Sequence, residues 1–217
     1  GEARTAAVVA VRDSELVHVA RQAFDEIVAK YPQVMQTIAR IVVRRLRAKE
    51  RQESGTLAKC FAVVAAGPGM PTTAFCERLV RGLATVGPTL HLSAARFDAL
   101  LNQTGLAEAD EEEAAGIRVT AWLDQQESQF RFLVYEADAG ASAWTRRCLR
   151  QADEIVLVAQ AGSDAALGEV EQSLLGADNA VSHARRTLVL LHPDGSRLPT
   201  RTARWFAGRN IQHHFHV

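Results

Sequence analysis

The fold is decided by the stretch Cys60-Phe61-Ala62-Val63-Val64-Ala65-Ala66-Gly67-Pro68-Gly69-Met70-Pro71-Thr72-Thr73. Its first seven residues are apolar and predict a buried strand. The segment Gly67–Pro71 predicts a loop, because glycine and proline interrupt regular structure. Thr72 or Thr73 can cap a following helix, in which apolar residues recur at helical spacing from Phe75 to Leu83. The stretch therefore predicts a strand–loop–helix unit.

The same alternation continues to residue 217. Further strands are predicted at Thr89–Leu92, Phe130–Tyr135, Ile155–Ala159, Thr187–Leu191 and Ile211–Val217. Helices are predicted at Ala94–Asn102, Asp110–Gln126, Ser142–Gln151, around Leu167 to Leu174, and at Arg201–Phe206. Most strands are short and apolar on both faces, which is typical of a parallel sheet covered by helices on both sides. We therefore predict a doubly wound, Rossmann-like α/β domain over residues 59–217, preceded by a polar linker at 51–58.

The loop after the first strand occupies the place of a phosphate-binding loop. Such a loop needs free backbone N–H groups, a lysine for the terminal phosphates and a hydroxyl for magnesium. Gly67, Gly69 and the hydroxyls of Thr72 and Thr73 fit this pattern, but Pro71 stands where the lysine belongs. Pro68 and Pro71 also remove two N–H donors. We expect no ATP hydrolysis here, and a plain strand-to-helix turn remains the alternative.

Two later segments resemble the ParA/MinD-like nucleotide hydrolases. Asp138-Ala139-Gly140, after a buried strand, resembles their acidic switch, and Ala152–Val158 resembles their following helix-to-strand step. The resemblance implies that the domain is a degenerate P-loop fold. It also implies that Asp138 belongs to the same candidate site as Gly67, Gly69, Thr72 and Thr73.

Residues 1–50 have a different pattern. Gly1–Leu16 resembles the last strands of a cyclic-nucleotide-binding domain, and Arg4-Thr5-Ala6 resembles the second half of its phosphate-binding cassette. The resemblance implies that Arg4 and Thr5 contact a cyclic phosphate in an intact domain; an exposed arginine is the alternative. Because the rest of that domain is absent from this sequence, we expect no cofactor in the chain itself. Two amphipathic helices follow, the first carrying Phe24 and Ile27.

Composition limits the remaining functions. The 25 basic and 25 acidic residues cancel, so nucleic acid is not an expected partner. The apolar runs are too short to cross a bilayer, no secretory signal is visible, and Cys60, Cys76 and Cys148 are expected to be buried free thiols of a cytoplasmic protein. No G-x-S-x-G nucleophile motif occurs.

Two groups of polar residues could form further sites. His214 and His216 should share one face of the last strand, but the sequence offers no third ligand near them, so we predict no metal site. Arg146, Arg147 and Arg150 are predicted to form a solvated basic face, with an acidic partner or a phospholipid headgroup as alternatives. Glu108–Glu113 is predicted to be a solvated helix start.

The string Trp144–Asp153, with Leu188–His192 and Thr200–Trp205, resembles neuropathy-target-esterase-like patatin phospholipases, in the region before their catalytic domain. The resemblance implies a serine hydrolase parent, a (lyso)phospholipase with a downstream patatin domain as partner and peripheral contact with a phospholipid membrane. This chain would be its non-catalytic regulatory or scaffolding segment, with no catalytic residue of its own. A nucleotide-binding switch and a structural spacer remain alternatives.

Overall fold

The computed structural model describes residues 18–31, 35, 58–67, 70, 72–110, 113–176, 181–193, 195 and 200–217. Two compact units are separated within the chain, and each is described by itself. Arg4, Thr5, the predicted strand at 6–11 and Gly69 lie outside the described residues. The predictions made for them therefore stay predictions.

The smaller unit contributes the helix α1 (Arg21–Lys30). It confirms the first predicted helix; it ends at Lys30, and its C-cap residue Tyr31 immediately precedes Pro32. None of its residues is buried, and Phe24 and Ile27 are 38% and 42% exposed. Within the described residues of its own unit, the apolar stripe of this helix therefore has no core to pack against.

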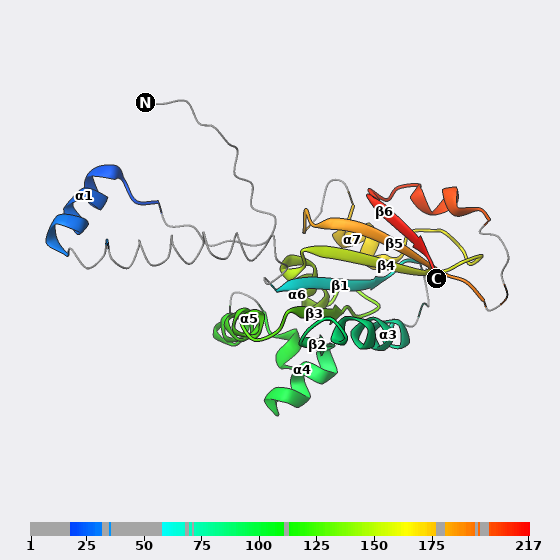
Figure 1. Cartoon of the computed structure of the whole chain (residues 1–217), viewed down its shortest axis with the longest axis horizontal. Helices are drawn as coiled ribbons and strands as arrows, with labels where there is room; N and C mark the ends of the chain where they lie inside the picture. Colours follow the sequence, from blue (N-terminus) through cyan, green and yellow to red (C-terminus); the bar gives the residue numbers. More distant parts are fainter. Residues whose placement is uncertain are drawn as a thin grey trace. The chain divides into compact units, whose positions relative to one another are not determined.

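The larger unit is built on six parallel strands (Figure 1). In chain order they are β1 (Lys59–Ala65), β2 (Thr89–Leu92), β3 (Phe132–Glu136), β4 (Glu154–Gln160), β5 (Arg185–Leu191) and β6 (His213–His216). Their order in the sheet is β2-β3-β1-β4-β5-β6, and each neighbouring pair is parallel. The chain thus starts in the middle of the sheet and builds outward in both directions, as the predicted doubly wound fold requires.

Helices cover both faces of this sheet. They are α3 (Thr73–Ala84), α4 (Ala94–Leu101), α5 (Ala114–Glu127), α6 (Ala143–Gln151) and α7 (Glu169–Leu174), with the short 3₁₀ helices η1 (Leu106–Glu108) and η2 (Thr202–Phe206). Two apolar clusters result because neighbouring strand residues point to opposite faces. Val63 and Val134 pack under α3, whereas Val64 and Tyr135 pack under α4 to α7.

The burial of the central strands explains why they could be predicted from their apolar sequence. The central strands β1, β3, β4 and β5 are apolar on both faces because each face is covered. The three cysteines are buried thiols outside any disulfide, as predicted. The edge strand β6 differs, since Phe215 and Val217 are more than half exposed.

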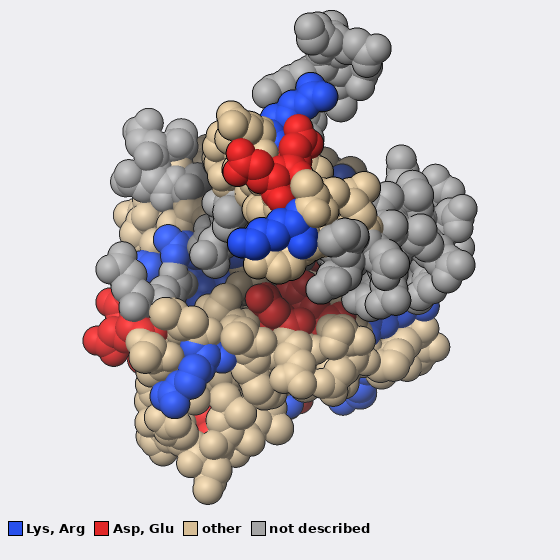
Figure 2. All heavy atoms as spheres, turned by 90° about the vertical axis from the view of Figure 1, so that its left-hand side faces the viewer, with Lys and Arg blue, Asp and Glu red and all other residues tan. Residues whose placement is uncertain are grey.

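The described surface has mixed charges. Lysine and arginine side chains lie among aspartate and glutamate side chains on the face that Figure 2 shows. Within the described ranges, no helix has the length and apolar character needed to cross a bilayer. The prediction that Arg147 belongs to a solvated basic face on α6 is wrong, because Arg147 is only 1% exposed.

Candidate functional site

The candidate site lies at the carboxyl edge of the sheet. β1 ends at Ala65, β2 at Leu92 and β3 at Glu136, and the register pairs Val63 with Glu136 and Leu92 with Tyr135. Parallel strands bring their carboxyl ends to one edge, where ligands of such folds bind. Gly67, which follows β1, and Thr72, which precedes α3, lie at this same edge.

Thr72 and Thr73 both turn toward the end of β3. The Thr72 hydroxyl donates to Glu136 Oε1 at 3.3 Å, and the Thr73 hydroxyl donates to the same oxygen. Thr72 is the N-cap residue of α3, but its side chain makes no capping hydrogen bond. The predicted side-chain cap is not formed, because Thr72 has helical φ and ψ rather than the extended backbone of a capping residue.

The other oxygen of Glu136 faces a histidine. His91 Nε2 lies 2.9 Å from Glu136 Oε2, and both residues are more than nine-tenths buried. Burial alone would raise the pKa of Glu136, but hydrogen bonds from His91, Thr73 and Thr72 outweigh it and lower that pKa. Glu136 is thus an anion held by three neighbours.

This arrangement predicts an acid-sensitive domain. The unfolded chain takes up a proton near the ordinary glutamate pKa of 4.5, while the folded protein holds Glu136 ionised to lower pH. The stabilisation is therefore present above pH 4.5 and is lost as the pH falls through the lower folded pKa. Glu136→Gln should flatten the acid limb of unfolding free energy against pH, measured by urea denaturation. The exposed control Glu77→Gln should keep the wild-type limb; equal slopes for all three proteins would contradict the assignment.

Gly67 makes the second contact of the loop with the rest of the chain. Its N–H donates to Glu171 Oε2 at 3.1 Å, and the N–H of Gly168 donates to the same oxygen at 2.9 Å. Gly67 has a φ of +83°, and an added Cβ would lie 3.2 Å from the Asp164 carbonyl. A side chain there would strain the backbone and crowd this carbonyl. The N–H that would begin a phosphate cradle is already bound to a carboxylate of the protein.

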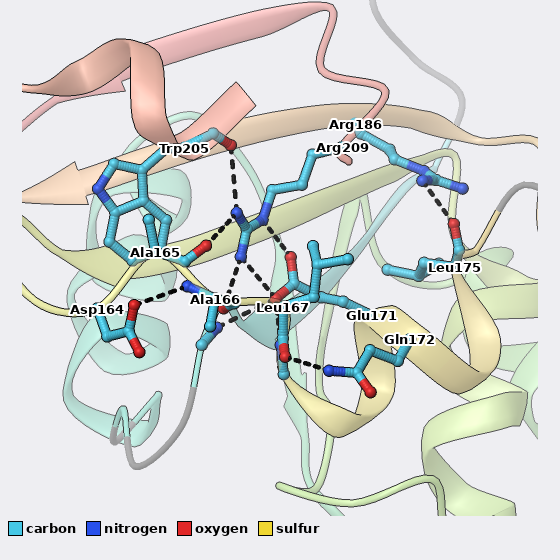
Figure 3. Close-up of polar contacts among 12 residues, drawn as sticks. Asp164, Ala165, Ala166, Leu167, Glu171, Gln172, Leu175, Arg186, Trp205 and Arg209 are labelled. Carbon is cyan, nitrogen blue, oxygen red and sulfur yellow. Dashed lines mark hydrogen bonds and ion pairs between the residues drawn. The ribbon is translucent and has the colours of Figure 1, made fainter. Parts of the chain in front are cut away.

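Arg209 neutralises that carboxylate from the other side (Figure 3). Its Nη2 donates to Glu171 Oε2 at 2.9 Å and its Nε to Oε1. The guanidinium also donates to the carbonyls of Ala165 at 2.9 Å and Ala166 at 3.1 Å, and it lies over the Trp205 ring. The side chains of Arg209 and Glu171 are only 2% and 3% exposed. This is a closed, fully partnered ion pair between α7 and the segment after η2.

Asp138, the predicted switch residue, lies against the start of α6. Its carboxylate accepts from the Ser142 hydroxyl at 2.6 Å, and its N–H donates to Thr145 Oγ1 at 3.0 Å. Burial raises the pKa of Asp138, and the carboxylates of Glu108 and Glu136 add to the rise against the Ser142 hydrogen bond. The unfolded chain ionises Asp138 first, so stability falls as the pH rises from the ordinary pKa of 3.8 through the higher folded pKa.

The predictions for Glu108 and Arg147 have different outcomes near α6. Glu108 is exposed, as predicted, and it also accepts the N–H groups of Ala143 at 2.9 Å and Trp144 at 3.4 Å at the first turn of the helix. Arg147 donates to the carbonyls of Ala107 at 2.7 Å and Ala109 at 2.8 Å. Its burial lowers the guanidinium pKa. Both residues fasten η1 to α6.

The remaining candidates lie elsewhere. Lys59 pairs with Glu154 at 2.7 Å; both begin strands, so this lysine lies at the amino edge of the sheet, away from the candidate site. His214 and His216 contact each other on the last strand, but His192 joins them, with its Nε2 2.7 Å from His216 Nδ1. Burial and these two histidines lower the pKa of His216.

The structure thus brings Gly67, Thr72 and Thr73 to one edge and adds residues that the sequence did not reveal. These are His91, Glu136, Glu171 and Arg209, together with Cys76 on α3. Glu136 carried one usable signal, since it is a charged residue ending an apolar strand. Glu171 and Arg209 are 38 residues apart, and no spacing rule links them.

Comparison with known proteins identifies relatives over the whole chain. A model of the "Neuropathy Target Esterase family P-loop like domain" matches residues 58–217. Patatin-like phospholipase domain-containing protein 7 of Rattus norvegicus is 32% identical over 237 residues, covering 100% of this chain but 17% of that protein. Patatin-like phospholipase domain-containing protein 6 of Homo sapiens is 32% identical, covering 99% and 16%. Lysophospholipase NTE1 of Cryptococcus neoformans is 33% identical, covering 99% and 13%.

A solved structure supports the fold. The crystal structure of a ParA family ATPase from Chlorobium tepidum TLS has a TM-score of 0.50 with this chain. The match covers 75% of this chain and 85% of the other, at 14% sequence identity. At this identity the likeness concerns the fold alone, and it confirms the predicted ParA-like α/β architecture. The chain spans less than a fifth of the length of the curated relatives named above.

Proposed function

Because the chain belongs to the neuropathy target esterase family, whose P-loop-like domain matches residues 58–217, we propose that it is a non-catalytic regulatory or scaffolding segment of a patatin-like (lyso)phospholipase. The observation that carries the proposal is that the candidate phosphate edge is filled by the protein itself. Glu171 takes the N–H groups of Gly67 and Gly168, and Glu136 takes the hydroxyls of Thr72 and Thr73.

The chemistry of this edge disfavours a bound nucleotide. A phosphate brings negative charge to free N–H donors and a lysine, whereas this edge holds two buried carboxylates and has Pro71 in place of the lysine. Moving Glu171 away from Gly67 would also disturb its buried pair with Arg209, which is costly. A bound nucleotide would therefore have to break these existing contacts before it formed its own. A structural role fits this edge of the sheet better.

The parts outside residues 58–217 complete the proposal. The relatives are much longer proteins, so hydrolysis of phospholipid esters is assigned to a patatin domain elsewhere in the same polypeptide, and this domain contacts it as an internal partner. Residues 1–50 are proposed as the last part of a cyclic-nucleotide-binding domain, joined through a linker at 51–58. Attachment to the membrane surface is assigned to the whole protein.

The proposal predicts a clear separation of activities. The purified 217-residue chain should hydrolyse neither lysophospholipid nor ATP, and calorimetry with ATP or GTP and Mg²⁺ should show no binding heat. In the whole protein, replacing residues 58–217 by an unrelated folded domain of similar size should change lysophospholipase turnover.

Three outcomes separate the alternatives. Unchanged turnover after the replacement would favour a spacer. A magnesium-dependent nucleotide signal that is lost in Thr73→Val would favour a switch. Hydrolysis by the isolated chain would overturn the proposal.

A further inference from the structure

Three potential metal ligands meet inside the carboxyl edge. Cys76 comes from the first turn of α3, His91 from β2 and Glu136 from the end of β3. One ligand atom from each lies within 4.8 Å of the other two, and all three residues are buried. This is the only such group of three among the described residues, and the proposed function uses Glu136 but neither Cys76 nor His91.

We propose that Cys76, His91 and Glu136 form a site for one zinc ion. Thiolate, imidazole and carboxylate are the three ligand types that Zn²⁺ accepts from proteins. The charges also balance, because Zn²⁺ with a Cys76 thiolate, a Glu136 carboxylate and a neutral His91 gives a neutral buried centre. Magnesium prefers oxygen ligands and would be a poor occupant of a site containing sulfur and nitrogen.

The geometry requires only local movement. His91 Nε2 and Glu136 Oε2 are 2.9 Å apart, slightly closer than two ligands of a tetrahedral ion with bonds of about 2.0–2.2 Å. The ion replaces the proton between these two atoms; that proton shifts to His91 Nδ1, and the thiol proton of Cys76 leaves to solvent. One proton per ion is therefore released.

Surrounding hydrogen bonds orient the ligands. The hydroxyls of Thr72 and Thr73 hold Glu136 through Oε1, which leaves Oε2 for the ion, and such outer contacts commonly fix metal-binding carboxylates. A water offers the fourth ligand, so both hydroxyls stay on Oε1. An ion in this position joins α3, β2 and β3 at the loop where a P-loop protein would hold its nucleotide. We assign it a bracing role, which does not depend on the proposed regulatory function.

Cobalt provides the direct test, because a cobalt(II) ion bound to thiolate shows a near-ultraviolet charge-transfer band. The metal-free 217-residue chain is titrated with Co²⁺ and then with Zn²⁺ under competition from a chelator. We expect one ion per chain, the thiolate band, and its loss on zinc addition. Cys76→Ser should abolish the band and weaken zinc binding by more than about 100-fold, since even loss of an outer contact costs 10- to 100-fold.

Matched variants test whether the ion is held by these three residues. Cys148→Ser removes an equally buried thiol on α6, and His216→Ala removes a histidine of the cluster at β6; both should retain the band and the affinity. His91→Gln, which keeps a donor for Glu136, should lose affinity as Cys76→Ser does, with tryptophan fluorescence checking that it folds. Absence of the thiolate band in the wild-type chain, or binding that survives Cys76→Ser and His91→Gln, would overturn the proposal.

Discussion

Arg209→Met is expected to lower the free energy of unfolding of the α/β unit by about 3–5 kcal/mol, the usual cost of removing one partner of a buried ion pair. Glu171 would keep its contacts with Gly67 and Gly168 but lose the guanidinium that neutralises it, at a side chain 3% exposed. The carbonyls of Ala165 and Ala166 would lose their guanidinium donors at the same time. The loop after β1 and the start of α7 should loosen together.

The measurement is urea denaturation followed by the fluorescence of the three tryptophans, all of which lie in residues 58–217. Arg96→Met is the matched control, because Arg96 pairs with Glu77 at 3.2 Å while both side chains are about half exposed. Such a pair contributes about 0–1 kcal/mol. The double variant Glu171→Leu/Arg209→Met should recover much of the loss, since no unpaired charge remains. Equal effects of the two arginine variants would refute the buried pair.

The helices and strands of the α/β unit were predictable because a parallel sheet that is covered on both faces needs strands that are apolar throughout. The runs around Val63, Val134 and Leu157 are apolar since neither face meets water. The predicted boundaries differ from the structure by a few residues at most, as at α5, which begins at Ala114 rather than Asp110. The fold class needed only this periodicity and the glycine loop.

The candidate site was predictable only in part, because its partners are set by tertiary contacts. A threonine before a helix normally caps it from an extended backbone, but Thr72 is itself helical in φ and ψ. Its hydroxyl donates to Glu136, which the sheet places beside it. Arg147 lies on a helix with a basic sequence, yet its position over η1 buries it against two carbonyls. The Glu171–Arg209 pair depends on the tertiary packing of α7 against the segment after η2, which cannot be read from the local sequence.

Trp144 connects the hydrophobic core to the candidate site. Trp144→Ala is expected to lower the free energy of unfolding by about 3–5 kcal/mol. Its side chain is fully buried. Its ring centroid lies 5.4 Å from that of Phe97 and 6.4 Å from that of Tyr135, and its Nε1 donates to the Glu136 carbonyl at 2.9 Å. Alanine would leave a cavity between α4, α6 and β3 and an unpaired carbonyl at the residue that holds Thr72 and Thr73.

Trp144→Phe separates these two causes. It keeps most of the ring packing and removes only the N–H donor, so the expected loss is about 1–3 kcal/mol, the cost of a buried acceptor left without its partner. Urea denaturation can follow both variants through the two remaining tryptophans, Trp122 and Trp205. Because Glu136 loses its backbone anchor in both, both should also shift the acid limb of stability that Glu136 produces. A loss in Trp144→Ala no larger than that in Trp144→Phe would mean that the ring fills no essential space, and that the hydrogen bond to β3 alone joins α6 to the candidate site.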